Sequence, residues 1–131
     1  MGVNTMKKFL ALLLIIVFVV CLFSCNGNYF NKAASQLERY GLERFDYDYK
    51  QINAIKKDLK AFNIEIEGGI TRIAHLLKKE GDILNYAYVY EFENSSDASL
   101  FYESYAKNSI SRLKGNVVVF GNLHMINSIK L

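Results

Sequence analysis

The chain has 131 residues, of which 51% are hydrophobic, and it carries a formal net charge of +3 at pH 7. This length allows one ordinary domain with one modest core and excludes two full-sized domains. Two of the positive charges, Lys7 and Lys8, lie in the apolar N-terminal segment, so the remainder has 14 basic and 13 acidic residues. Because nucleic-acid binding usually requires a clear excess of Lys and Arg, this near balance argues against a nucleic-acid partner.

The N-terminal segment has the pattern of an export signal. A lysine pair is followed by fifteen uninterrupted apolar residues, from Phe9 to Phe23. A membrane-spanning helix needs about 20 apolar residues, whereas the hydrophobic region of a signal peptide needs about 7 to 15. The sequence therefore predicts a signal peptide over 1–24, and translation from either Met1 or Met6 would retain it.

This predicted signal peptide ends in Leu22-Phe23-Ser24-Cys25, which resembles the lipobox of bacterial lipoproteins. In that class a branched apolar residue at position minus three and a small residue at minus one fit the signal peptidase, and Leu22 and Ser24 match these roles. Phe23, at the more permissive position minus two, is larger than the commonest residues there. The resemblance implies cleavage before Cys25 and a diacylglyceryl group on its thiol, which makes the membrane the expected partner.

Two alternatives to lipidation stay open: an uncleaved membrane anchor, or cleavage by the ordinary signal peptidase that leaves Cys25 as a free thiol. Cysteine usage favours lipidation, because no cysteine follows Cys25 and an exported chain would otherwise carry an unpaired thiol there. A diacylglyceryl group supplies two acyl chains, which is enough for stable anchoring. The expected location is the cell membrane, on its extracytoplasmic face.

The rest of the chain predicts a short tether and one small domain. We expect the lipidated cysteine and the polar segment after it, residues 25–31, to be the tether, and residues 32–131 to be the domain. Hydrophobic periodicity then indicates the elements of that domain in chain order: a helix over 32–40, a strand over 42–49, a helix over 50–62, strands over 70–79 and 85–92, a helix over 94–105, a strand over 117–120 and a final short helix near 125–129. The periodicity of 70–79 alone fits either a strand or a helix, and we predict a strand because residues 80–82 have the composition of a turn into the next strand.

The six middle elements follow the order βαββαβ, which predicts an α+β fold of the ferredoxin-like split-sandwich type, with an extra helix at each end. In that fold one sheet buries its apolar face under two helices. The lipobox leader, together with the strand AYVYEF (87–92), the acid-capped Ala/Phe/Tyr helix that follows it and the strand VVVFGN (117–122), also resembles small uncharacterised lipoproteins of low-GC Gram-positive bacteria. That resemblance implies the fold and the location, and it brings no activity with it.

The predicted domain contains no recognisable catalytic or metal-binding motif. His75 and His124 lie in neither HxH nor HxxxH spacing, which favours a structural or surface role for each over a metal site. No phosphate-binding glycine loop occurs, and no serine lies in a GxSxG or SxxK context. We therefore expect no cofactor, no metal and no catalytic residue.

The one unusual feature is an aromatic ladder in the strand over 85–92. Strict alternation there places four rings on one face, Tyr86, Tyr88, Tyr90 and Phe92. If the ladder faces the helices it is core, which is the favoured interpretation, and if it faces solvent it is a platform for stacking or for docking a peptide.

Two hypotheses for the function follow. The first, which we favour, is a non-enzymatic, lipid-anchored extracytoplasmic binding or accessory module that binds another envelope protein or a peptide through its sheet or an exposed edge strand. The alternative is an extracytoplasmic enzyme of unrecognised type, in which Glu91 or Glu103 meets His75 or His124 in a pocket.

Overall fold

The computed structural model of the chain describes residues 7–8 and 29–131. The expected cleavage site and Cys25 lie outside these residues. Within the described ranges, no helix is both long enough and apolar enough to cross a membrane.

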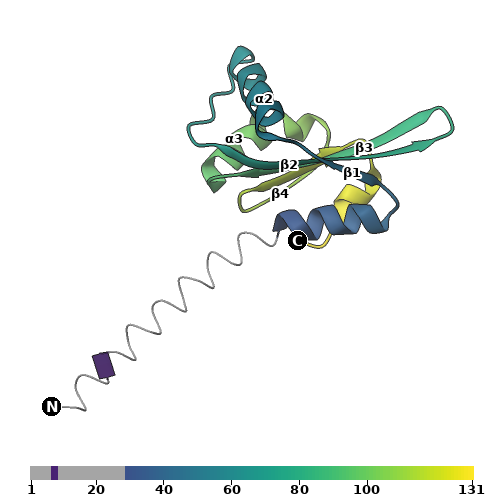
Figure 1. Cartoon of the computed structure of the whole chain (residues 1–131), viewed down its shortest axis with the longest axis horizontal. Helices are drawn as coiled ribbons and strands as arrows, with labels where there is room; N and C mark the ends of the chain where they lie inside the picture. Colours follow the sequence, from purple (N-terminus) through teal and green to yellow (C-terminus); the bar gives the residue numbers. More distant parts are fainter. Residues whose placement is uncertain (1–6, 9–28) are drawn as a thin grey trace.

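A five-stranded antiparallel sheet forms the centre of the domain (Figure 1). The strand order is β1-β2-β3-β5-β4. With helices on the sheet, this architecture confirms the predicted α+β class. The strands are β1 (Glu43–Asp46), β2 (Ile70–Glu80), β3 (Ile83–Phe92), β4 (Ile110–Lys114) and β5 (Val117–Gly121).

The strand connectivity differs from the predicted ferredoxin-like split sandwich. In a split βαβ unit another strand separates the two strands that the helix joins. Here β1 and β2, which are joined through a helix, are hydrogen-bonded antiparallel neighbours. One strand, β4, was not predicted, because its sequence ISRLK is mostly polar. It forms by pairing with β5 across a turn in which Gly115 has a φ of 58°.

Three helices and two short 3-10 helices complete the domain. Residues 29–39 form the N-terminal helix, followed by α2 (Tyr49–Ala61) and α3 (Ser95–Ser104). These correspond to the three longer helices that the sequence predicts. The 3-10 helices are η1 (Ala106–Asn108) and η2 (His124–Ser128), and η2 takes the place of the predicted final helix.

The strand predicted over 42–49 is shorter than expected, because a helix cap interrupts it. The Asp48 carboxylate accepts a hydrogen bond from the Gln51 backbone N–H (2.8 Å), and the Gln51 side chain accepts one from the Asp48 N–H (2.9 Å). This reciprocal capping box begins α2 at Tyr49. The backbone therefore leaves the sheet after Asp46, and Tyr49 projects into solvent with 78% of its surface exposed.

Helices pack on both faces of the sheet, whereas the sequence predicted helices on one face only. Helices α2 and α3 lie on one side of the sheet, and the N-terminal helix and η2 lie on the other (Figure 1). Because strand side chains alternate, β3 supplies both cores. Ala87 and Val89 pack under the N-terminal helix, and Tyr90 and Phe92 pack under α3.

The first described turn of the N-terminal helix belongs to the folded domain, although the sequence placed it in the tether. Phe30 is only 1% exposed and packs in the same core as Leu37 and Val89. The Arg72 guanidinium carbon lies 4.2 Å from the centre of the Phe30 ring, and Arg72 is paired with Glu91 (2.7 Å). This cation–π contact joins the helix to β2 and β3.

Phe30 therefore provides a test of where the domain begins. We expect Phe30→Ala to lower the free energy of unfolding by about 3–5 kcal/mol, as truncation of a buried phenylalanine does. Tyr40→Ala, at a side chain that is 62% exposed in the turn directly after this helix, is the matched control and should change the free energy of unfolding by about 0.5 kcal/mol or less. Urea denaturation measures both values. Equal effects of the two substitutions would mean that Phe30 belongs to the tether and not to the folded domain.

Candidate functional site

The aromatic ladder of β3 divides into a buried half and a partly exposed half. Tyr90 and Phe92 are 5% and 0% exposed, and the Tyr90 ring stacks on Phe101 of α3 at 5.0 Å. Tyr86 and Tyr88 are half-buried. The hypothesis of a four-residue platform is therefore wrong for Tyr90 and Phe92, because α3 covers their end of the sheet.

Cross-strand register brings further rings beside Tyr88. His75 of β2 lies opposite Tyr88 on one side, and Phe120 of β5 lies opposite it on the other. Phe45 of β1 lies opposite His75 in turn. Directly opposed residues on neighbouring strands share a face, so these side chains form a row across the sheet.

The partly exposed rings around this row form the aromatic shelf, which we define as Phe45, Tyr47, His75, Tyr86 and Tyr88. The sequence singled out Tyr86 and Tyr88 and predicted a structural or surface role for His75. The alternation of residues 42–49 puts Phe45 and Tyr47 on one side of their strand, but no local pattern indicates which strands become neighbours. The shelf is therefore assembled by the fold.

Ring stacking orders the shelf internally. The His75 and Tyr88 rings lie 4.1 Å apart and nearly parallel, at 11°. Tyr47 contacts His75 edge-on at 6.1 Å. On its other side Tyr88 stacks on Phe120, which is 5% exposed, at 5.2 Å. A buried ring thus supports the exposed ones, which limits the conformational entropy that a ligand would have to remove.

The shelf is open rather than enclosed, and a groove adjoins it. Phe45 is 46% exposed, and the other four members are half-buried. Beside Tyr47, a cavity of about 450 Å³ lies between α2 and the start of β2, with Ile52 in its wall. Two charged side chains, Lys56 and Glu93, also line this cavity. It therefore offers both apolar and polar contacts next to the rings, as interfaces between proteins do.

The stacked rings of His75 and Tyr88 carry no charge near neutral pH. Burial lowers the pKa of the His75 imidazole, because desolvation disfavours the protonated ring. Burial, together with the neighbouring hydroxyl of Tyr47, raises the pKa of Tyr88 to about 12. Both rings are therefore neutral when stacked, so an apolar or aromatic ligand group can approach them without desolvating an ion.

The residues considered for an enzymatic pocket are not brought together in the described part of the chain. Glu91 pairs with Arg72 at 2.7 Å, and Glu103 pairs with Lys107 at 3.1 Å. His75 lies on the shelf, whereas His124 begins η2 on the opposite side of the sheet. Within the same described ranges, no group of three or more His, Cys, Asp and Glu residues is placed to hold a metal ion.

Comparisons of the chain with protein-family models, curated proteins and solved structures find no match. The functional assignment therefore rests on the chain's own residues, above all on the geometry of the aromatic shelf.

Titration of His75 tests the environment assigned to the shelf. We expect the pKa of His75, followed by NMR of its ring protons, to lie below the ordinary value of 6.5. Because the folded-state pKa is lowered, the stability contributed by the neutral ring is present above pH 6.5 and is lost as the pH falls through the folded-state pKa.

Two variants control this measurement. Tyr88→Ala removes the ring stacked on His75 and should move the pKa of His75 back toward 6.5. His124→Gln, on the other side of the sheet, should leave it unchanged. A pKa of His75 at or above 6.5 in the native chain would contradict the buried stack.

Proposed function

We propose that the chain is a lipid-anchored binding module on the extracytoplasmic face of the cell membrane, which uses its aromatic shelf to bind an extended peptide segment of another envelope protein. The lysine pair, the fifteen-residue apolar stretch and the lipobox-like tetrapeptide support the anchor at Cys25. The binding role is supported by one observation above all, the partly exposed stack of His75 on Tyr88, backed by Phe120.

The form of the shelf favours a peptide over a small molecule. Small-molecule sites are concave and bury most of their ligand, whereas the shelf is an open surface. Tyrosines suit protein and peptide recognition, because each combines a large apolar ring with a hydroxyl that can hydrogen-bond at the edge of the contact.

The edge of the sheet offers a way to hold such a peptide. β1 is an edge strand, and its pairing with β2 ends at Leu77, although β2 continues to Glu80. A peptide that adds as a strand beside β1 would gain main-chain hydrogen bonds. Its alternate side chains would then extend the row that begins with Phe45 and His75.

The anchor is tested by a single substitution. We expect the native chain, expressed in a bacterial host, to lose its leader and gain the mass of a diacylglyceryl group, and to fractionate with membranes. Cys25→Ala should lack the added mass, because the thiol that accepts the lipid is gone. Intact-mass spectrometry and membrane fractionation measure both. If the native chain and the variant both retain the leader, the chain is held by an uncleaved membrane anchor, and the proposed lipid on Cys25 is wrong.

The shelf is tested with peptides selected on the native chain from a random-sequence display library. We expect Tyr88→Ala to weaken their binding by about tenfold, the loss typical of a central aromatic contact. Tyr40→Ala removes an exposed ring from the turn after the N-terminal helix and serves as the matched control, with unchanged affinity. Calorimetry or fluorescence anisotropy gives the dissociation constants. Equal affinities for the native chain and Tyr88→Ala would refute the binding role of the shelf.

A further inference from the structure

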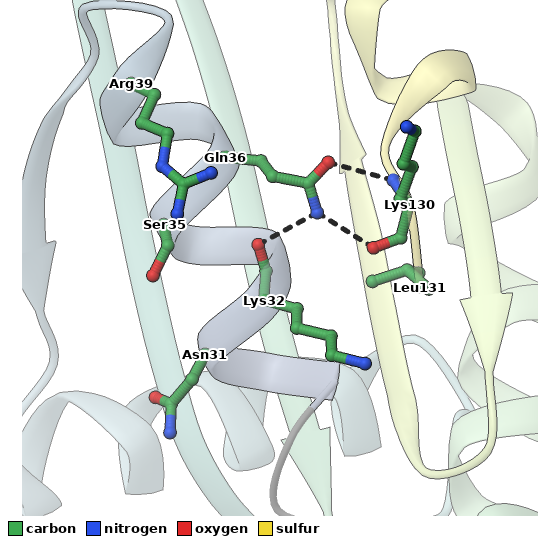
Figure 2. A pocket seen from close by; sticks show the side chains of 7 residues that line it. All are labelled: Asn31, Lys32, Ser35, Gln36, Arg39, Lys130 and Leu131. Atoms are coloured by element: carbon green, nitrogen blue, oxygen red, sulfur yellow. Dashed lines mark hydrogen bonds between the residues drawn. The ribbon is translucent and has the colours of Figure 1, made fainter.

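A second surface feature, the basic groove, lies between the N-terminal helix and the C-terminal segment (Figure 2). We define it by Lys32, Gln36, Arg39, Lys130 and Leu131. Its cavity has a volume of about 640 Å³. Three of the five residues carry a positive charge, and no acidic side chain lines the groove.

One glutamine fixes the two walls of the groove relative to each other. The Gln36 side-chain nitrogen donates hydrogen bonds to the Lys130 carbonyl (2.8 Å) and the Lys32 carbonyl (3.1 Å). Its oxygen accepts a hydrogen bond from the Lys130 backbone N–H (2.9 Å). Figure 2 shows the two bonds to Lys130 crossing from the helix to the last residues, and the bond to Lys32 staying within the helix. The helix and the C-terminal segment therefore present their cations together.

The cations of the groove are not neutralised within the described residues. Elsewhere in the domain, Arg44, Arg72 and Lys107 are each paired with a carboxylate. No such pair within 4.0 Å involves Lys32, Arg39 or Lys130 among the described side chains. The groove is thus a local excess of positive charge on a body whose basic and acidic residues nearly balance, and it is complementary to an anionic surface.

The position of the groove indicates which anionic surface it meets. Only three residues lie between Cys25 and Tyr29, where the described helix begins, and the four residue steps from Cys25 to Tyr29 span at most about 14 Å. Lys114 adds a cation at the same end of the domain, because its amine lies 5.8 Å from the Tyr29 ring centre. A lipid on Cys25 therefore holds this basic end close to the bilayer surface.

We propose that the basic groove docks on the anionic phospholipid headgroups of the membrane that holds the anchor. This inference rests on the proposed lipid anchorage. Each Lys or Arg close to an anionic bilayer strengthens the attachment of a protein to that bilayer by about fivefold. Lys32, Arg39 and Lys130 together therefore favour the orientation of the domain in which the groove faces the lipid. In that orientation the N-terminal helix faces the lipid, and the aromatic shelf, on the other side of the sheet, faces away from it.

The test uses the mature, lipidated chain reconstituted in vesicles of phosphatidylcholine, with or without phosphatidylglycerol. An environment-sensitive fluorophore is placed on Ser35→Cys, in the wall of the groove, and in a second preparation on Asp82→Cys, at the turn between β2 and β3. We expect phosphatidylglycerol to reduce quenching of the Ser35 probe by aqueous iodide at least twofold and to leave the Asp82 probe unchanged. High salt should abolish the difference, because it screens exposed charges.

Charge-matched variants identify the residues responsible. The triple variant Lys32→Gln, Arg39→Gln and Lys130→Gln should lose the protection of the Ser35 probe. The control triple Lys50→Gln, Lys57→Gln and Lys60→Gln removes three exposed cations from α2, on the other side of the sheet, and should retain it.

Three outcomes would overturn the docking proposal. The first is equal quenching of the Ser35 probe in both kinds of vesicle, and the second is an equal loss of protection in the two triple variants. The third is protection of the Ser35 probe by inorganic phosphate in neutral vesicles, which would make the groove a site for a dissolved anion. Intact mass and vesicle flotation, measured on the same samples, report the lipid anchor separately. A chain without lipid contradicts the anchorage itself, whereas a lipidated chain with an exposed groove contradicts only the docking.

Discussion

The register of β3 between β2 and β5 is the constraint on which the rest of the domain depends. It places Tyr88 between His75 and Phe120 on one face and Val89 between Ala74 and Val119 on the other. A slip of one residue would exchange the two faces and move tyrosines into the core under the N-terminal helix. The close approach of β5 to β3 reinforces this register, because a Cβ atom at Gly121 would collide with the Tyr86 carbonyl and the Ala87 backbone.

The buried carboxylate of Asp97 determines how much of the sheet α3 covers. Asp97, in the first turn of α3, is 4% exposed and accepts a hydrogen bond from the Gly68 N–H (2.8 Å). The Asp97 backbone N–H is itself capped by the Asn94 side chain (2.8 Å). These bonds hold the start of α3 against the segment that precedes β2. The helix therefore covers Tyr90 and Phe92 and leaves Tyr86 and Tyr88 accessible.

The aromatic shelf and the basic groove lie on opposite sides of the sheet, so each can be in contact with a different partner at the same time. The proposed membrane contact of the N-terminal helix and the proposed peptide contact of the aromatic shelf therefore do not compete for space. The Arg72 side chain links the two layers, because it contacts Phe30 of the N-terminal helix and pairs with Glu91 of β3. A domain held to lipid through its first helix would thus present the shelf in a defined direction.

The sequence by itself determined what local periodicity and chemistry encode: the three longer helices, the two long strands and the alternation that puts aromatic rings on one face of β3. These signals depend on residues close together in the chain. The strand order, the fifth strand and the burial of Phe30 were decided only by the tertiary structure. Each requires contacts between distant residues, and no periodicity within a segment specifies its partner. For the same reason, the stack of His75 on Tyr88 became evident only when β2 and β3 were paired.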